Sequence, residues 1–198
     1  MVVMKECDDV LGLDPGKVNY AWARVDLRGR VVAAGFFART ITSMARAERA
    51  QVKSCLDGLR ELVRQSRART VAVEQFAARQ FGTSLSQYVN TMQGLLMAAC
   101  DEQDVECHSV MPSTWKNAIR ALGDLESLYR YAKSLKVPPH VVDASCIGLY
   151  VRRNFKFLPS DKLVITANVR RCAKFASVTD ALPVRPKAKR RKRRVRKS

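Results

Sequence analysis

The sequence predicts an α/β domain in which one mixed five-stranded sheet is flanked by helices, and three observations lead to this prediction. Short apolar runs alternate with longer segments of helical periodicity, in the order βββαβαβα followed by further helices. The first three strands are joined by tight turns, which is typical of an antiparallel meander. The first and the fourth predicted strands each end in an acidic residue.

The first part of the domain holds the meander and one long helix. The opening strand is the apolar run Val10-Leu-Gly-Leu-Asp14, which stops at a Pro-Gly turn. The second strand is predicted over 19–26 and the third over 30–37. A helix is predicted over 43–66, because apolar residues recur there at helical spacing, namely Val52, Cys55, Leu56, Leu59, Leu62 and Val63.

The rest of the domain alternates the two remaining strands with helices. The β-branched run Thr70-Val-Ala-Val-Glu74 predicts the fourth strand, and residues 105–110 predict the fifth. Between them, apolar residues at helical spacing predict a helix over 83–102. After the fifth strand, further helices are predicted at 113–121, at 124–135, from the Pro138-Pro139 pair to 154, and within 159–180.

Composition and charge exclude several classes of protein. The chain has 198 residues, 36 of them Lys or Arg against 18 Asp or Glu, so its formal net charge is +18 and it is expected to bind a polyanion such as nucleic acid. No apolar run approaches 18 residues, so no membrane span is expected. The acids among the first ten residues do not fit a signal peptide. The six cysteines are scattered without a C-x-x-C pair, which favours reduced thiols in an intracellular protein over disulfides or zinc.

Much of the positive charge lies in a short C-terminal segment. Residues 183–198 contain ten Lys or Arg and no acid, so we expect a disordered arm that follows a folded domain of residues 1–182. Such an arm suits contact with the DNA backbone, nuclear import, or no specific role. The residues expected to contact DNA are Lys187, Lys189, Arg190, Arg191, Lys192, Arg193 and Arg194.

Three acids and one histidine form the candidate site. Asp14 and Glu74 end strands, and Asp143 lies in the first turns of a late helix with His140 three residues before it on the same face. Carboxylates gathered from distant parts of a chain repel one another unless a positive group lies between them. Oxygen ligands of this kind suit Mg²⁺ or Mn²⁺, and two such ions about 4 Å apart can activate water and stabilise the leaving oxygen of a phosphodiester.

Each of these residues also has an ordinary structural interpretation. Asp14 precedes Pro-Gly and suits a turn, Glu74 can face solvent, and His140 can be a surface histidine. Asp143 can complement the positive end of its helix dipole. Only the joint placement of the four, at two strand ends and in one late helix, favours a metal site.

Three motifs carry a resemblance to a known family. They read Leu11-Gly-Leu-Asp-Pro-Gly-Lys-Val-Asn19, Val71-Ala-Val-Glu-Gln75 and His140-Val-Val-Asp-Ala144. In this order they resemble the three acidic motifs of RuvC-type Holliday-junction resolvases, which have the RNase H-like fold, and the similarity runs from about residue 10 to 150. The segment Val110-Met-Pro-Ser-Thr-Trp-Lys116 looks more like the branch found in large DNA viruses such as poxviruses and iridoviruses.

The resemblance implies an activity, a cofactor and partners. It implies a homodimer, formed through the helix over 83–102, that resolves four-way DNA junctions by symmetric cleavage during DNA recombination, replication and repair. Two Mg²⁺ ions per site are expected, with Mn²⁺ as a substitute, and Lys116 would lie near the scissile phosphate. The metal ligands would be Asp14, Glu74 and Asp143, and His140 would be a further ligand or would help to position the attacking water. A viral protein would act in the cytoplasm or nucleus of the infected cell, and a bacterial or phage protein in the cytoplasm or nucleoid.

Two departures from the family pattern concern DNA contacts. Bacterial members have a second lysine after the position of Lys116, whereas residues 123–127 offer none here, which leaves Arg120 or Arg130 as its replacement. The aromatic side chain that follows the Glu-Gln pair in bacterial members stands at a different offset. Phe76 and Phe81 are candidates for stacking on an unpaired base, with core packing as the ordinary alternative, and Arg79 is a candidate phosphate contact.

Three other functions are alternatives to junction resolution. A nuclease for RNA–DNA hybrids or a transposase-like nuclease would keep the fold and change the substrate. An actin-like ATPase needs two such domains, for which 198 residues are too few. A non-catalytic basic DNA-binding protein is the third alternative. Three converging carboxylates speak against it, because they would repel DNA unless metal ions neutralised them.

Overall fold

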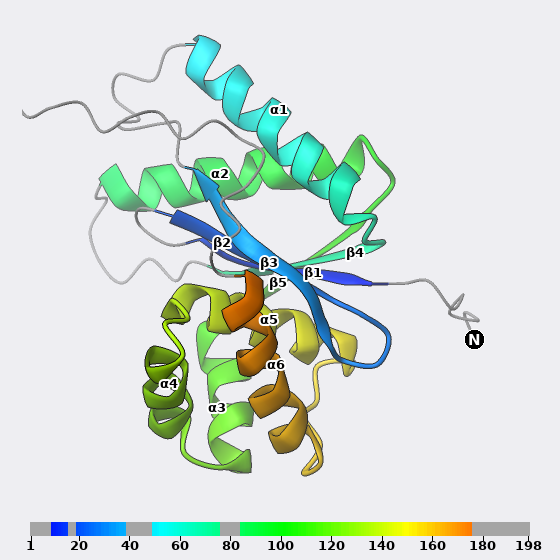
Figure 1. Ribbon diagram of the computed structural model, residues 1–198. Coiled ribbons are helices and arrows are strands. Elements are labelled where there is room, and N and C mark those ends of the chain that lie inside the picture. The colour runs from blue at the N-terminus through cyan, green and yellow to red at the C-terminus, as the bar shows by residue number, and fades with distance from the viewer. Residues whose placement is uncertain (1–8, 16–18, 39–48, 76–83, 176–198) are drawn as a thin grey trace, which may run out of the picture.

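A twisted sheet between two layers of helices makes up the chain in the part that the structure describes (Figure 1). The structure is a computed structural model, and it describes residues 9–15, 19–38, 49–75 and 84–175. The predicted α/β class with one mixed five-stranded sheet is confirmed. Among these residues, no helix is both long enough and apolar enough to cross a membrane.

The sheet has the strand order β3-β2-β1-β4-β5. The strands β1, β2 and β3 form an antiparallel meander, whereas β4 pairs parallel with β1, and β5 parallel with β4. The turn between β2 and β3 is closed by Asp26, whose carboxylate accepts backbone hydrogen bonds from Arg28 and Arg30. The bounds of the strands are Val10–Pro15 for β1, Asn19–Val25 for β2, Val31–Ala38 for β3, Thr70–Glu74 for β4 and Glu106–Val110 for β5.

Two hydrophobic cores lie on opposite faces of the sheet. On one face, α1 (Arg49–Ser66) and α2 (Ser84–Asp101) pack over odd-numbered residues of β1 and β4, such as Leu13 and Val73. The other face is covered by four helices (Figure 1). These are α3 (Pro112–Leu122), α4 (Leu125–Ser134), α5 (Pro139–Arg152) and α6 (Asp161–Phe175).

The parallel pairing of β1 with β4 brings the two acidic strand ends together. Leu13 pairs with Val73, so the next residues, Asp14 and Glu74, lie on neighbouring strands at the same edge of the sheet. Because side chains alternate between the faces of a strand, both acids share the face of Gly12, which packs against α5. The register therefore directs both carboxylates toward the four-helix layer.

Helix α5 lies closer to the sheet than side chains would allow. A Cβ atom at Gly12 would stand 2.1 Å from the carbonyl oxygen of Ala144 and 2.6 Å from the backbone nitrogen of Gly148. The two glycines therefore let the backbones of β1 and α5 meet directly. Residues 141–151 of α5 are all buried, which makes it the central helix of its layer.

The observed elements match the predicted ones, with shifts of a few residues at their ends. Helix α1 begins at Arg49 in the described part of the chain, and residues 43–48 of the predicted helix lie outside it. Helix α6 covers 161–175 of the segment predicted at 159–180, and residues 176–180 also lie outside the described residues. The same is true of the predicted arm over 183–198 and of the domain boundary before it.

Candidate active site

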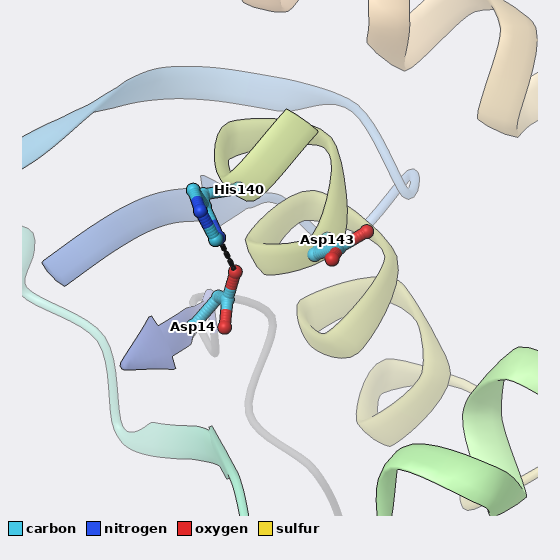
Figure 2. Close-up of side chains that lie close together, drawn as sticks. All are labelled: Asp14, His140 and Asp143. Carbon is cyan, nitrogen blue, oxygen red and sulfur yellow. Dashed lines mark hydrogen bonds and ion pairs between the residues drawn. The ribbon is translucent and has the colours of Figure 1, made fainter. Parts of the chain in front are cut away.

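Asp14 and His140 form a close pair where β1 meets the start of α5. Nδ1 of His140 lies 2.6 Å from Oδ2 of Asp14. Asp14 is only 6% exposed, whereas the His140 side chain is about half exposed. Figure 2 shows the imidazole pointing from the first turn of the helix onto the carboxylate at the strand end. One member of the pair is thus fixed in the core, and the other borders solvent.

Asp143 joins this pair from the next turn of α5 (Figure 2). One potential ligand atom from each of Asp14, His140 and Asp143 can be chosen so that all three lie within 4.8 Å of one another. Asp143 is 9% exposed, and its Oδ1 accepts a hydrogen bond of 2.5 Å from the hydroxyl of Tyr129 on α4. Two carboxylates and one imidazole therefore converge on one small volume.

Glu74 borders this cluster and is held by α3. Its Oε2 accepts a hydrogen bond of 2.9 Å from Nε1 of Trp115, a fully buried residue. Glu74 does not belong to the set of described residues whose ligand atoms meet within 4.8 Å. The structure thus places it beside Asp14 in the sheet, adjoining the three-residue cluster.

Lys116 supplies positive charge between Glu74 and Asp143. Its Nζ lies 3.9 Å from Oε2 of Glu74 and 3.9 Å from Oδ2 of Asp143. It also lies over the ring of Trp115, 4.8 Å from the ring centroid. The first turns of α3 therefore bring both a neutral donor and an ammonium group to the acids.

The pKa values of the cluster show that its negative charge is not fully compensated. Burial, followed by the charge of Asp14, raises the pKa of Asp143 to about 7 and also raises the pKa of Glu74. The hydrogen bond to Asp14 raises the pKa of His140. Burial and the charge of Asp143 raise the pKa of Tyr129, so its hydroxyl keeps its proton and remains a donor. A bound cation would relieve this excess of negative charge.

The donor set fits a divalent cation. Carboxylate oxygens suit hard ions such as Mg²⁺ and Mn²⁺, and an imidazole nitrogen is a common additional ligand for transition metals. Asp14, His140 and Asp143 offer these atoms within bridging distance, and Glu74 adds a fourth polar group at the border. The residues gathered here are therefore of the kind that can hold a divalent cation.

The structure brings together all five residues that the sequence predicted for the centre. Asp14, His140 and Asp143 form the cluster, while Glu74 and Lys116 lie beside it. Sequence reasoning missed two further residues, Trp115 and Tyr129. Trp115 precedes Lys116 in the segment that carries the family resemblance, which could have drawn attention to it. Tyr129 stands in an ordinary amphipathic helix and carries no comparable signal.

Of the candidate DNA contacts outside the centre, only Arg120 and Arg130 lie among the described residues. Arg120 donates a hydrogen bond to Asn117, and Arg130 donates to Asp124 and Ser127, so both exposed arginines already have partners on their own helices or turn. No contact in the described ranges joins either of them to the acids. Phe76, Arg79 and Phe81 lie outside the described residues, as do the basic residues 187–194.

Comparison with solved structures places the fold among junction resolvases. Two structures of RuvC from Thermus thermophilus, one described as a complex with a Holliday junction substrate, align with a TM-score of 0.56. They are 24% and 23% identical to the chain and cover 75% and 74% of it, against 97% of their own length. The yeast mitochondrial Holliday junction resolvase Ydc2 aligns with a TM-score of 0.49 at 15% identity, over 87% of this chain and 86% of its own.

Comparison of sequences identifies the family. No curated protein matches the chain at a significant level. The family model described as crossover junction endodeoxyribonuclease RuvC matches residues 10–128, which is more than half of the chain and includes Asp14, Glu74 and Lys116. The RNase H-like arrangement of the sheet agrees with this match. The chain therefore belongs to the RuvC family of crossover junction endodeoxyribonucleases and is a junction-resolving nuclease.

Proposed function

We propose that this nuclease cleaves four-way DNA junctions with the help of Mg²⁺, for which Mn²⁺ substitutes, bound by Asp14, His140 and Asp143 with Glu74 as a further ligand. The observation that carries the proposal is the convergence of three ligand atoms within 4.8 Å in a chain of the RuvC family. The raised pKa of Asp143, to about 7, supports it, because a site with uncompensated negative charge favours a cation.

The positions of the side chains suggest a separate role in the cleavage reaction for each residue of the site. A bound divalent cation would supply Lewis-acid activation of water and stabilise charge on the scissile phosphate. Asp14 and Asp143 are held in place by burial, so they present fixed oxygens at the end of β1 and the start of α5. His140, at the exposed side, serves as a ligand or orients the attacking water. Lys116 provides an ammonium group for the developing charge on the phosphate.

We further propose that branched DNA is the substrate. The Thermus thermophilus RuvC with which this chain aligns is described as bound to a Holliday junction, and the net charge of +18 suits binding to a crowded set of phosphates. The segment from Val110 to Lys116 supports a place in the branch of the family found in large DNA viruses.

Symmetric cleavage of a four-way junction calls for two active sites, so we propose that the working form is a homodimer. Helix α2 is the helix expected at the contact, but most of its apolar side chains pack into the chain's own core. Val89, Met92, Leu96 and Ala99 are buried there. A dimer contact through this helix would therefore use its opposite side, where Gly94, Met97 and Ala98 are exposed.

The proposal is tested by cleavage of a labelled four-way junction with Mg²⁺, beside a linear duplex and an RNA–DNA hybrid of equal length. We expect paired symmetric nicks in the junction alone. Asp14→Asn should abolish cleavage and keep junction binding, because it removes a ligand without adding bulk. Asp57→Asn, on the outer surface of α1, is the matched control and should cleave normally.

Two other outcomes would overturn the proposal. Preferential hydrolysis of the hybrid would indicate a nuclease of the same fold with a different substrate. Binding to all three nucleic acids without cleavage, and without any effect of the metal, would indicate a basic DNA-binding protein.

A further inference from the structure

In the described part of the chain, the hydroxyl of Tyr129 is a neutral donor in direct contact with the carboxylate of Asp143. It donates to Oδ1 at 2.5 Å, from helix α4, while Oδ2 of the same carboxylate lies 3.9 Å from Nζ of Lys116. Tyr129 is itself partly buried, and Asp143 is 9% exposed. The two oxygens of Asp143 therefore have different neighbours, a neutral hydroxyl on one and a distant ammonium on the other.

This arrangement matters because the acids of the cluster repel one another. Asp14 and Asp143 each offer an oxygen to the same volume, so mutual repulsion favours rotation of Asp143 away from Asp14. A hydrogen bond from a neutral donor opposes that rotation without neutralising the carboxylate, which stays available to a cation. A positively charged donor in the same place would compete with the cation.

A second pair in the site follows the same pattern. Nε1 of Trp115 donates to Oε2 of Glu74 at 2.9 Å, again as a neutral group from the helices that cover the site. Each of the two acids contacted by Lys116 thus has one neutral donor of its own, supplied by α3 or α4. Donors of this kind behind ligating carboxylates orient them, and their loss typically weakens metal binding by 10- to 100-fold.

We infer that Tyr129 is a positioning residue that holds the Asp143 carboxylate in the orientation needed to bind a divalent cation. It contacts neither the phosphate nor the water of the reaction in this assignment and acts through Asp143 alone. The inference rests on the proposed role of Asp143 as a metal ligand. It adds a residue from α4, outside the three acidic motifs, to the metal centre.

The chain offers a matched pair of substitutions for the test. Tyr129→Phe removes only the hydroxyl that donates to Asp143. Tyr131→Phe removes a hydroxyl two residues further along the same helix, where it accepts a hydrogen bond from Arg170 instead. Asp143→Asn removes the carboxylate itself. The binding of Mn²⁺ to each full-length protein is measured by electron paramagnetic resonance of the free ion, with no DNA present.

We expect Tyr129→Phe to weaken Mn²⁺ binding about 10-fold and Tyr131→Phe to leave it unchanged. The Mn²⁺ concentration for half-maximal junction cleavage should rise by the same factor in Tyr129→Phe, and saturating Mn²⁺ should restore much of the rate. Junction affinity measured in Ca²⁺ should not change. A general structural defect would alter junction affinity and would not be overcome by metal. Unfolding temperatures in EDTA show that every variant is folded at the temperature of the measurement.

The outcomes separate this inference from the proposed site. If Asp143→Asn loses Mn²⁺ binding while Tyr129→Phe binds as the wild type does, Asp143 is a ligand and the positioning role of Tyr129 is wrong. If Asp143→Asn binds Mn²⁺ as well as the wild type, or the wild type binds none, the proposed metal site fails and the inference fails with it. Equal weakening in Tyr129→Phe and Tyr131→Phe would also overturn the inference, because it would trace the effect to α4 as a whole.

Discussion

At the scale of single residues, the site is dominated by charge that the protein alone does not balance. Asp143 is buried near Asp14, and Lys116 lies 3.9 Å from it, too far for a hydrogen bond. The folded protein therefore holds this carboxylate at a cost in stability. That cost disappears when a cation binds or when the carboxyl group takes up a proton.

The cost predicts an unusual dependence of stability on pH in the absence of metal. The pKa of Asp143 is raised from 3.8 to about 7, so between these values the folded carboxyl keeps a proton that the unfolded one has lost. Its contribution to the free energy of unfolding therefore falls as the pH rises from about 4 to about 7. Asp143→Asn removes this loss, and we expect it to raise the free energy of unfolding at pH 8 by on the order of 2 kcal/mol.

Thermal unfolding in EDTA at pH 4 and pH 8 measures the effect. The difference between Asp143→Asn and wild type should be small at pH 4, which lies close to the unfolded pKa of 3.8, so the folded and unfolded carboxyl groups differ there by only part of a proton. It should be large at pH 8, above both pKa values. Glu74 and His140 are present in both proteins, and the charge of Asp143 also raises the pKa of His140, so the comparison measures Asp143 together with its effect on His140. An Asn variant that is less stable than wild type at pH 8 would contradict the pKa assigned to Asp143.

The acids of the site could be predicted from the sequence, but their supporting contacts could not. Asp14 and Glu74 each end an apolar run, and His140 and Asp143 share a helix face, so the joint placement of the four drew attention to them. The contact between Tyr129 and Asp143 depends on how α4 packs against α5. Nothing in the local sequence of an amphipathic helix records which of its side chains faces an acid.

At the scale of elements, the position of α5 is set by its contact with β1. The Cβ atom of an alanine at position 12 would stand 2.1 Å from the backbone of Ala144, one residue after Asp143. Backbone atoms cannot move aside as a flexible side chain does, so the helix itself would have to shift. Such a shift would move both His140 and Asp143 relative to Asp14.

We therefore predict that Gly12→Ala destabilises the protein by more than about 2 kcal/mol and abolishes cleavage even where the protein folds. Gly94→Ala is the matched control, because Gly94 lies exposed in α2 with open space around its Cβ position. There the same substitution should stabilise by about 0.5–1 kcal/mol through helix propensity. Urea unfolding of both variants measures the effects on stability. Junction cleavage is compared between Gly12→Ala and wild type, because Gly94 lies on the face of α2 proposed for the dimer contact. A Gly12→Ala protein with wild-type stability and activity would show that β1 and α5 are not in direct contact.

The sequence predicted the elements well and their neighbours less well. Periodicity and turn residues located every strand and helix to within a few residues in the described part of the chain. The placement of β4 beside β1, rather than beside β3, comes from a pairing between residues 60 positions apart, such as Leu13 and Val73. Local patterns carry no information on such pairings, which depend on the packing of both layers.

At the scale of the whole molecule, a chain of strongly positive net charge carries a site that is locally negative. The net charge is +18, and the ten basic residues of 183–198 account for more than half of it, since 18 minus 10 leaves +8 for the rest. Binding of DNA by basic residues releases counterions, so affinity falls steeply with salt. The charge of the domain and that of the C-terminal segment therefore make separable contributions.

We predict that a chain ending at Leu182 binds junctions with a smaller salt dependence than the full chain but still cleaves them at low salt. A full-length variant with glutamine in place of all ten Lys and Arg of 183–198 is the control for length and should behave in the same way. Fluorescence anisotropy of a labelled junction between about 50 and 200 mM salt measures the slope. Unchanged slopes in both variants would mean that the segment does not contact DNA.

The spread of the site along the chain has a consequence for a partly made or partly degraded protein. Asp14 and Asp143 meet only through the pairing of β1 with its neighbours and the packing of α5 against them. No fragment that lacks either end of the span from residue 14 to residue 143 carries the full cluster. With this cluster as the proposed active site, we expect a nascent chain to lack nuclease activity until α5 has been synthesised and packed against β1. A single proteolytic cut that releases either end should likewise remove that activity.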